Sequence, residues 1–382
     1  MTSPTSETTL EQVQALTPSI REAAGDIRSA RCVPAALVAD LKAAGVFRMP
    51  MPVAWGGPEM SPHDQLDVIE ALSSADGSVG WISMIGCDAG FYSAFFDDAV
   101  GRSIWPDLDM VTAGMVAPAA SATRDGDGWR LSGRWAFGSG STHADVFVGG
   151  ALLEGEPVDA NGMPAWRTFV LPSEEVTVHD NWRTTGLEGT GSNDYSVTDV
   201  WIPDEHGFSV LERSRRDEPL YRLPWMFATK IAGVPLGLAR RAIDETAALA
   251  ETKLVLPEFA LLKDRAMTHV EMAKAEALAA SARAYVVEAL GSVWDTCLHG
   301  DDPSARQTAS LRLAVTNAAF ACRDAIQRCY DLVSTSSIKS GSPLDQILRD
   351  AEVCCQHVLV GTRTYEQIGR RLLGVEPAGI MI

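Results

Sequence analysis

The sequence predicts an α+β protein in which an N-terminal helical domain, a central β domain and a C-terminal four-helix bundle follow one another. Apolar residues recur at helical spacing to about residue 110, and alternation with period two replaces this spacing from residue 111. Long helical segments with few breakers occupy the rest of the chain. We therefore expect domains over residues 1–110, 111–220 and 221–382.

The first domain is predicted from a helix start and a long apolar segment. Ser61 and Pro62, with Asp64 in the following turn, are typical of a capped helix N-terminus. The segment from Val79 to Phe96 is apolar on nearly every side. We expect this segment to form one helix, buried at the centre of the domain.

The central domain is predicted from alternating strands separated by turn residues. Residues 125–128 read Asp-Gly-Asp-Gly, a turn signal, and residues 129–137 alternate with period two. Short strands without intervening helices favour a small antiparallel barrel or sandwich that ends near Pro203. The further strand-like runs are residues 145–153, 166–171, 175–178 and 195–202.

The C-terminal domain is predicted from four long helical segments. Three of them begin at or near proline, and Gly300 and Gly374 follow two of the ends. A helix as long as the second segment would extend about 60 Å, more than one small domain can cover. We expect a bundle that uses its remaining apolar surface for self-association. The segments are residues 228–251, 257–298, 303–333 and 343–373.

Composition limits the partners and the compartment. The 382 residues are 46% hydrophobic and 21% charged, as in a globular protein, and their net charge is −18. This charge disfavours nucleic acid and anionic membrane surfaces as partners. No apolar run reaches the ~18 residues of a membrane span, and no signal-like segment opens the chain, so we expect a cytoplasmic protein. The seven cysteines form no Cys-x-x-Cys pair and are expected to be reduced.

Several classes of enzyme lack their motifs in this sequence. A Gly-x-Gly-x-x-Gly dinucleotide fingerprint, a Walker loop and a Gly-x-Ser-x-Gly elbow are all missing. None of the seven histidines has an acid three residues upstream, which disfavours a di-iron site, and we expect no metal site of another kind. Because a nicotinamide-binding motif is also missing, electrons for a redox reaction must come from another protein.

Three stretches of sequence carry a resemblance to a known family. Residues 135–145 read Trp-Ala-Phe-Gly-Ser-Gly-Ser-Thr-His-Ala-Asp, and residues 182–195 contain Gly-Leu-Glu-Gly-Thr-Gly-Ser-Asn. Residues 348–351 read Leu-Arg-Asp-Ala, and His357 follows the aspartate by seven residues. In this order and spacing, the chain resembles the acyl-CoA dehydrogenase-fold superfamily, and within it the two-component (group D) flavin-dependent monooxygenases.

The resemblance implies a reaction. In the dehydrogenases, a catalytic glutamate follows the Arg-Asp pair within a Glu-Gly-Thr motif, whereas residues 354–359 here read Cys-Cys-Gln-His-Val-Leu. Removing an α-proton from an acyl thioester needs a base at that place, so the monooxygenase branch is favoured. This branch implies reduced FMN, or FAD as the alternative, supplied by a separate flavin reductase. With O2 the flavin would form a C4a-hydroperoxyflavin that hydroxylates a phenolic, indolic or polycyclic aromatic molecule. The branch and the long helices together imply a homotetramer.

The resemblance also implies roles in a flavin site. Ser139 lies where the family places a hydroxyl that hydrogen-bonds flavin N5, and the glycines beside it let the backbone approach the ring. His357 lies where members place a histidine, as a base toward a substrate hydroxyl or a donor to the transferred oxygen; titration near neutrality suits both roles. The expected catalytic residues are thus Ser139 and His357. The expected flavin-binding residues are Phe137, Ser139, Gly140, Thr190, Ser192 and Lys253, of which the lysine would hold the phosphate of a neighbouring subunit's cofactor.

Residues 81–96 resemble the helix that lines the substrate pocket of the family. Several aromatic hydroxylases carry a histidine near the middle of this helix, where this chain has Cys87 and Asp88. This departure implies either a different substrate or a polar role for Asp88. The aromatic residues of the segment suit stacking on a planar ring. The expected substrate residues are Trp81, Cys87, Asp88, Phe91 and Tyr92.

Alternatives stay open from the residues alone. Ser139 and the loop at residues 190–192 could be ordinary turns, His357 and the aromatic residues could be core packing, and Lys253 could be a solvated helix residue. For function, one alternative is an acyl-CoA dehydrogenase with a relocated base. The others are an N- or S-oxygenase of the same fold and a non-catalytic scaffold without flavin.

Overall fold

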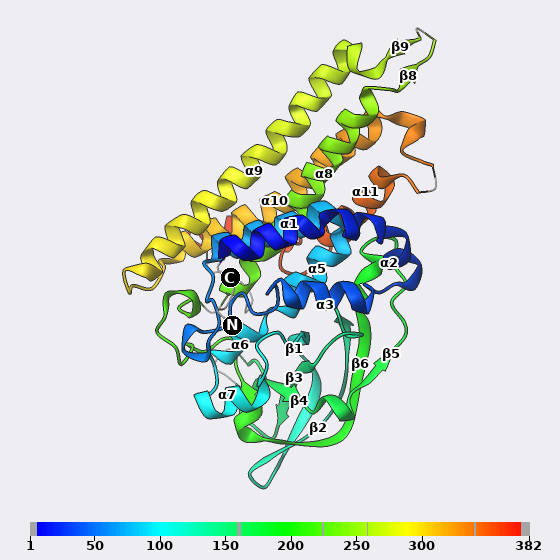
Figure 1. The fold of residues 1–382 in the computed structure, drawn as a ribbon. Coiled ribbons are helices and arrows are strands. Elements are labelled where there is room, and N and C mark those ends of the chain that lie inside the picture. The colour runs from blue at the N-terminus through cyan, green and yellow to red at the C-terminus, as the bar shows by residue number, and fades with distance from the viewer. Residues whose placement is uncertain (1–5, 159–161, 224, 258, 340, 376–382) are drawn as a thin grey trace.

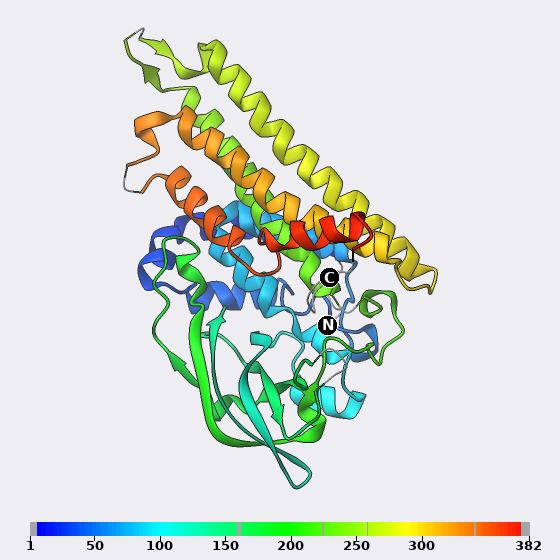
Figure 2. The same cartoon turned by 180° about the vertical axis from the view of Figure 1, so that it is seen from behind.

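The computed structural model has helices above and a β-sheet below (Figure 1). The helices include a long, slanting bundle, and the first N-terminal helices lie between this bundle and the sheet, whereas residues 89–104 lie beside the sheet (Figure 1 and Figure 2). The order of helices, strands and helices along the chain confirms the predicted α+β class. The structure describes residues 6–158, 162–223, 225–257, 259–339 and 341–375.

The N-terminal part is helical as far as residue 104. Ser61 caps α4, because its Oγ accepts a hydrogen bond of 3.2 Å from the Asp64 backbone N–H. The expected single helix over residues 79–96 is wrong: the chain turns at Cys87 and Asp88, which directs the Asp88 carboxylate toward Lys230. The elements are α1 Ser6–Glu22, α2 Ala24–Ala30, α3 Ala35–Ala43, η1 Val53–Trp55, α4 Pro62–Ala75, α5 Gly77–Gly86, α6 Ala89–Ser93 and α7 Asp98–Ile104.

The central part is a seven-stranded sheet in the order β5-β6-β2-β1-β3-β4-β7. Most neighbouring strands are antiparallel, as predicted. The exception is β1 with β3: the chain reverses before and after β2, so β3 runs in the same direction as β1 and pairs with its free side. The strands are β1 Thr112–Asp125, β2 Gly128–Gly138, β3 Val146–Glu154, β4 Trp166–Leu171, β5 Thr177–His179, β6 Asn193–Pro203 and β7 Gly207–Phe208. The short helices beside them are η2 Ser173–Glu175, η3 Glu188–Thr190 and η4 Asp204–His206.

A buried aromatic pair fixes the end of β2 against β6. Trp135 and Tyr195 are opposite each other in the register, and their rings stack with centroids 5.2 Å apart. The Tyr195 hydroxyl donates to the Val148 carbonyl over 2.6 Å and accepts from the Met115 backbone N–H over 2.8 Å. Since both rings are fully buried, they hold the turn that follows β2 in one position.

The C-terminal part is a helical bundle in which α9 and α10 lie side by side (Figures 1 and 2). Two expected helices differ from the structure. The segment from residue 257 begins with half of a β8–β9 hairpin, and the segment 343–373 divides at residues 356–362. His357 therefore lies in a break between two helices, whereas we expected it within one. The elements are η5 Pro219–Tyr221, η6 Met226–Ala232, α8 Gly233–Ala250, β8 Leu254–Val255, β9 Ala260–Leu261, η7 Leu262–Asp264, α9 Ala266–Leu298, α10 Ala305–Leu332, η8 Ser334–Ser336, α11 Pro343–Cys355 and α12 Arg363–Leu372.

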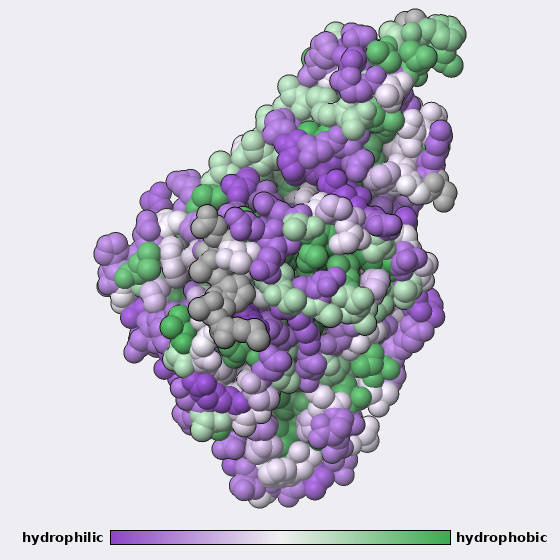
Figure 3. Space-filling model, in the orientation of Figure 1, coloured by the Kyte–Doolittle hydropathy of each residue, from purple (hydrophilic) through white to green (hydrophobic). Residues whose placement is uncertain are grey.

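The β8–β9 hairpin carries apolar side chains on the surface at the far end of the bundle (Figure 3). Leu254, Leu256 and Phe259 are 57%, 69% and 71% exposed. Within the described ranges, no helix combines the length and the apolar character that crossing a bilayer requires.

Candidate active site

The turn after β2 and the η3 loop place three hydroxyl groups in a row. Ser139 Oγ lies 2.8 Å from Ser192 Oγ, which lies 2.7 Å from Thr190 Oγ1, and all three side chains are buried. Thr190 donates its own proton to the Leu187 carbonyl, 2.8 Å away. The row therefore runs in one direction: Ser192 donates to Thr190, and Ser139 donates to Ser192.

Trp81 connects this row with His357. Its indole Nε1–H donates to Ser139 Oγ over 3.0 Å, and its ring meets the His357 imidazole edge-on with centroids 5.3 Å apart. Three residues from distant parts of the chain therefore meet through one indole. Because Ser139 already donates to Ser192 and accepts from Trp81, one acceptor lone pair remains at its oxygen.

His357 is a neutral side chain in this environment. Burial, followed by the charge of the Arg312 guanidinium, lowers the pKa of His357 to about 4. The expectation that this histidine titrates near neutrality is therefore wrong. The Leu359 backbone N–H donates to His357 Nδ1 over 3.4 Å, which leaves the imidazole proton on Nε2. Of the two roles considered for His357, this tautomer favours the hydrogen-bond donor.

The other expected substrate residues gather around a buried lysine. The Asp88 carboxylate pairs with Lys230, whose Nζ lies 4.7 Å from the centre of the Phe91 ring. The Tyr92 hydroxyl donates to Asp88 over 3.4 Å. Burial alone would lower the pKa of Lys230, but the Asp88 carboxylate raises it, so the lysine stays charged. Burial also raises the pKa of Cys87 to about 12, which makes this cysteine a neutral thiol.

Asp350, from the Leu-Arg-Asp-Ala stretch, holds the loop that carries the hydroxyl row. Its Oδ1 accepts from the Leu187 backbone N–H and from Gln346 Nε2, each over 2.6 Å. Burial, followed by the nearby Asp76 carboxylate, raises the pKa of Asp350 to about 8. The carboxyl group is therefore mostly protonated at neutral pH.

Asp350→Asn is expected to change how stability depends on pH. The pKa of Asp350 is about 8 in the folded chain against an ordinary value of 3.8, so its contribution to stability decreases as pH rises between these values. Asparagine resembles the protonated carboxyl but does not titrate, so the variant avoids the cost of protonating Asp350 on folding, which begins near pH 3.8 and grows by about 1.4 kcal/mol per pH unit up to about pH 8. The variant should therefore be more stable than the wild type at pH 6, and by a wider margin at pH 9. Urea denaturation at both pH values measures the free energy of unfolding, with Asp345→Asn as the control nearer the surface. If the stability of Asp350→Asn and of the wild type depends on pH in the same way, the raised pKa of Asp350 is wrong.

The remaining expected flavin-binding residues lie in two places. Phe137 and Gly140 flank Ser139 with left-handed backbone, at φ 64° and 74°. The Phe137 side chain is 64% exposed and meets the Trp182 ring edge-on. Lys253 lies apart from this group, at the end of α8, where its Nζ donates to Ser336 Oγ within the bundle.

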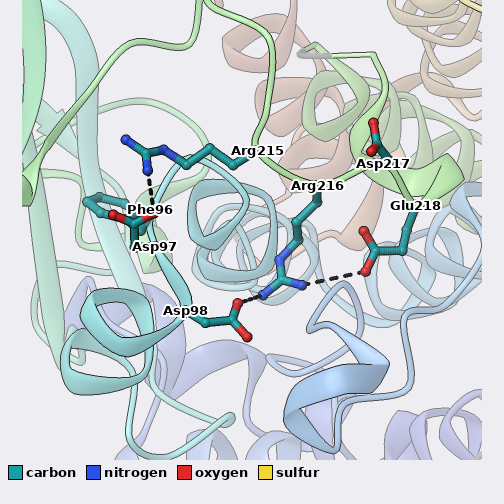
Figure 4. A pocket seen from close by; sticks show the side chains of 7 residues that line it. All are labelled: Phe96, Asp97, Asp98, Arg215, Arg216, Asp217 and Glu218. Carbon is teal, nitrogen blue, oxygen red and sulfur yellow. Dashed lines mark hydrogen bonds and ion pairs between the residues drawn. The ribbon is translucent and has the colours of Figure 1, made fainter.

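A surface cavity of about 620 Å³ lies between residues 96–98 and 215–218 (Figure 4). Arg215 pairs with Asp97, and Arg216 lies 2.5 Å from Asp98 and 3.5 Å from Glu218. Both arginines are paired with acidic residues, and none of the expected site residues lines the cavity. We therefore place the candidate site around Trp81 and not here.

Two buried basic residues, Lys230 and Arg312, are not among the expected site residues. Each is a lone basic residue in a short apolar segment, at residues 225–239 and 311–315. A single cation in such a segment is the signal that could have found them, because a charge in a buried position needs a partner.

Both ends of the chain match one known family. Residues 5–95 match the acyl-CoA dehydrogenase N-terminal domain, and residues 229–362 match the acyl-CoA dehydrogenase C-terminal domain. The chain is 34% identical over 369 residues to an indole-3-acetate monooxygenase of Pseudomonas putida, which covers 95% of this chain and 94% of that protein. It is 27% identical over 357 residues to the flavin-dependent monooxygenase oxygenase subunit HsaA of Rhodococcus jostii, covering 90% and 92% of the two proteins.

The chain belongs to the two-component flavin-dependent monooxygenases of the acyl-CoA dehydrogenase fold. The crystal structure of 3-HSA hydroxylase from Rhodococcus sp. RHA1 has the same fold as this oxygenase, with a TM-score of 0.89 and 25% identity over 98% of this chain and 99% of that one. Membership sets aside a dehydrogenase with a relocated base and a scaffold without flavin. An oxygenase subunit uses reduced flavin, and it implies a separate flavin reductase.

The residues around Ser139 fit a reduced flavin. Reduced flavin carries a proton at N5, and Ser139 has one acceptor lone pair left for it. A Cβ added at Gly140 would meet only Ile82, at 3.8 Å, so the backbone is open to a close approach at this turn. The oxygenase thus has a buried acceptor and an open glycine turn next to each other.

Proposed function

We propose that this oxygenase hydroxylates a planar aromatic small molecule, phenolic, indolic or polycyclic, with O2 and reduced FMN, or with reduced FAD as the alternative. The observation that carries the proposal is the contact of Trp81 with both Ser139 and His357. A planar ring system is already accommodated between a hydroxyl and an imidazole, as an aromatic ligand would require. The 34% identity to an indole-3-acetate monooxygenase supports the indolic class.

The proposed flavin site consists of the residues on and around the β2 turn. When bound, the reduced flavin would activate O2, from which the transferred oxygen atom comes. Ser139 Oγ would accept a hydrogen bond from flavin N5–H, and Gly140 and Phe137 would lie along the ring. Thr190 and Ser192 would hold Ser139 in its orientation through the hydroxyl row. Lys253 would bind the cofactor phosphate of a neighbouring subunit.

The proposed substrate site lies on α5 and α6. Trp81, Phe91 and Tyr92 would supply aromatic walls, and the neutral Cys87 thiol would add apolar surface. His357 would donate from Nε2 to the substrate or to the transferred oxygen. Asp88 would act through its pair with Lys230, which fixes the turn between α5 and α6.

A homotetramer is part of the same proposal. The β8–β9 hairpin exposes three large apolar side chains at the end of the bundle, which favours contact with another copy of the chain. Lys253 lies directly before this hairpin, so the contact would bring the lysine to a neighbouring subunit.

A flavin titration coupled to product analysis tests the proposal. We expect at least tenfold tighter binding of reduced than of oxidised flavin, with FMN ahead of FAD, measured anaerobically by fluorescence quenching. With a flavin reductase, NADH and indole-3-acetate or a phenol, mass spectrometry should detect a product heavier by one oxygen atom. If the added oxygen is attached to carbon, the result supports hydroxylation. If it is attached to nitrogen or sulfur, the result supports the N- or S-oxygenase alternative. Equal affinity for both redox states, with hydrogen peroxide as the sole oxygen product, would overturn the proposal.

A further inference from the structure

Arg312 differs from the other buried basic residue of the oxygenase. In the described part of the chain, Lys230 and Arg312 are the basic side chains with less than one tenth of their surface exposed. Lys230 is paired with Asp88, whereas Arg312 forms no ion pair with any described residue. A buried charge without a counterion is costly, so proteins keep such a charge where something else compensates it.

The contact that Arg312 does make uses a small part of its hydrogen-bonding capacity. Its Nη2 donates to the Leu359 carbonyl over 2.9 Å, in the break between α11 and α12. A guanidinium has five N–H donors in a planar fork, which suits a carboxylate that accepts two of them at once. Burial lowers the pKa of Arg312 to about 10, so the side chain remains charged at neutral pH.

Arg312 lies beside the candidate active site. Its charge contributes to the lowered pKa of His357, and the carbonyl that it binds follows His357 by two residues. It also lines a small cavity between η6 and α10, whose free volume of about 10 Å³ is too small for an aromatic ring. The other residues of this cavity are mostly apolar: Leu223, Trp225, Ala228, Thr229, Thr308, Leu311 and Val315. This cavity therefore has room for no more than a small polar group beside the guanidinium.

We propose that Arg312 binds the carboxylate of an aromatic acid and thereby selects anionic aromatic substrates. This inference rests on the proposed function. The carboxylate would supply the counterion that the described residues do not, and the aromatic ring would lie in the proposed substrate site beside His357. The net charge of −18 makes a buried cation the more useful for recognition, because the protein surface as a whole repels an anion.

Paired substrates test the proposal. The probes are indole-3-acetate, its neutral amide indole-3-acetamide, and 3-methylindole, which lacks the carboxylate. Dissociation constants are measured anaerobically on the complex with reduced flavin and on the flavin-free protein, and KM, kcat and product yield are measured with the reductase. The variants are Arg312→Met, Arg312→Lys and the control Arg306→Met, which removes an exposed arginine from the same helix.

The expected pattern separates this proposal from the proposed function. Wild type should prefer the acid, and Arg312→Met should weaken its binding about 10- to 100-fold while changing the neutral probes less than about threefold. Arg312→Lys should restore part of the preference, and Arg306→Met should bind like wild type. Wild type that binds acid and amide equally would overturn the role of Arg312, even if Arg312→Met fails to fold. Loss of flavin affinity in Arg312→Met, with unchanged acid preference, would overturn it in favour of the cofactor phosphate as counterion. Oxygenation of the neutral probes by Arg312→Met would still support the proposed function, whereas no oxygenated product from any probe and any variant would contradict that function.

Discussion

Lys230→Met should destabilise the oxygenase by about 3–5 kcal/mol, the usual cost of removing one partner of a buried ion pair. The Lys230 and Asp88 side chains are 1% and 5% exposed, so water cannot replace the missing ammonium group. Methionine keeps the length of the side chain, so the loss would come from the unpaired Asp88 carboxylate and not from a cavity. The urea concentration at half-unfolding, followed by circular dichroism and tryptophan fluorescence, measures the change.

A double variant distinguishes a lost charge pair from disturbed packing. Asp88→Asn combined with Lys230→Met removes both charges, and most of the stability should return. Lys263→Met serves as the matched control, because Lys263 pairs with Glu251 on the surface, and its removal should change stability little. If the double variant is as unstable as Lys230→Met, the pair is not the source of the effect.

Much of the fold can be predicted from the sequence because its signals are local. Ser61 and Pro62 mark a helix start through groups that lie within one turn. The alternation at residues 129–137 marks β2 because one face of the sheet is buried, as the stacked Trp135 and Tyr195 rings show. The order of helices and strands follows from such local patterns.

The breaks in the helices depend on contacts between distant residues, so the sequence pattern does not reveal them. The chain turns at Asp88 where its carboxylate meets Lys230, 142 positions away. The break after α11 is held by Arg312, which donates to the Leu359 carbonyl. Apolar residues occur on both sides of each break, so their spacing alone does not show where the helix stops.

The candidate site also combines features that local sequence predicts with features that depend on distant contacts. The motifs at residues 135–145 and 348–351 draw attention to Ser139 and His357, but they contain no information about the Trp81 indole that contacts both. The pKa of His357 depends on burial and on Arg312, which lies on another helix. Such pKa shifts follow from the packing of distant residues. The sequence therefore predicts that His357 titrates near pH 7, whereas in the fold it is an uncharged hydrogen-bond donor.

Ser139→Ala should decouple the oxygenase, with product per NADH oxidised falling roughly 10- to 100-fold and hydrogen peroxide rising correspondingly. The proposed site gives Ser139 three hydrogen bonds: one from the Trp81 indole, one to Ser192, and one from flavin N5. Alanine removes all three, so the N5 proton would lose its acceptor and Trp81 would lose its anchor. Product and peroxide are quantified together under turnover with the reductase, and the affinity for reduced flavin is measured separately.

Two companion variants show whether this effect belongs to the flavin contact or to the loop. Ser141→Ala removes an equally buried hydroxyl from the same turn, one that donates to the Gly191 carbonyl over 2.9 Å. It should lower stability and leave the ratio of product to peroxide unchanged. Ser139→Thr keeps a hydroxyl at the place where the N5 acceptor is needed, so it should recover much of the coupling. If Ser139→Ala and Ser141→Ala decouple the enzyme equally, the role of Ser139 is to hold the loop, because a direct contact with N5 predicts that only the first variant does so.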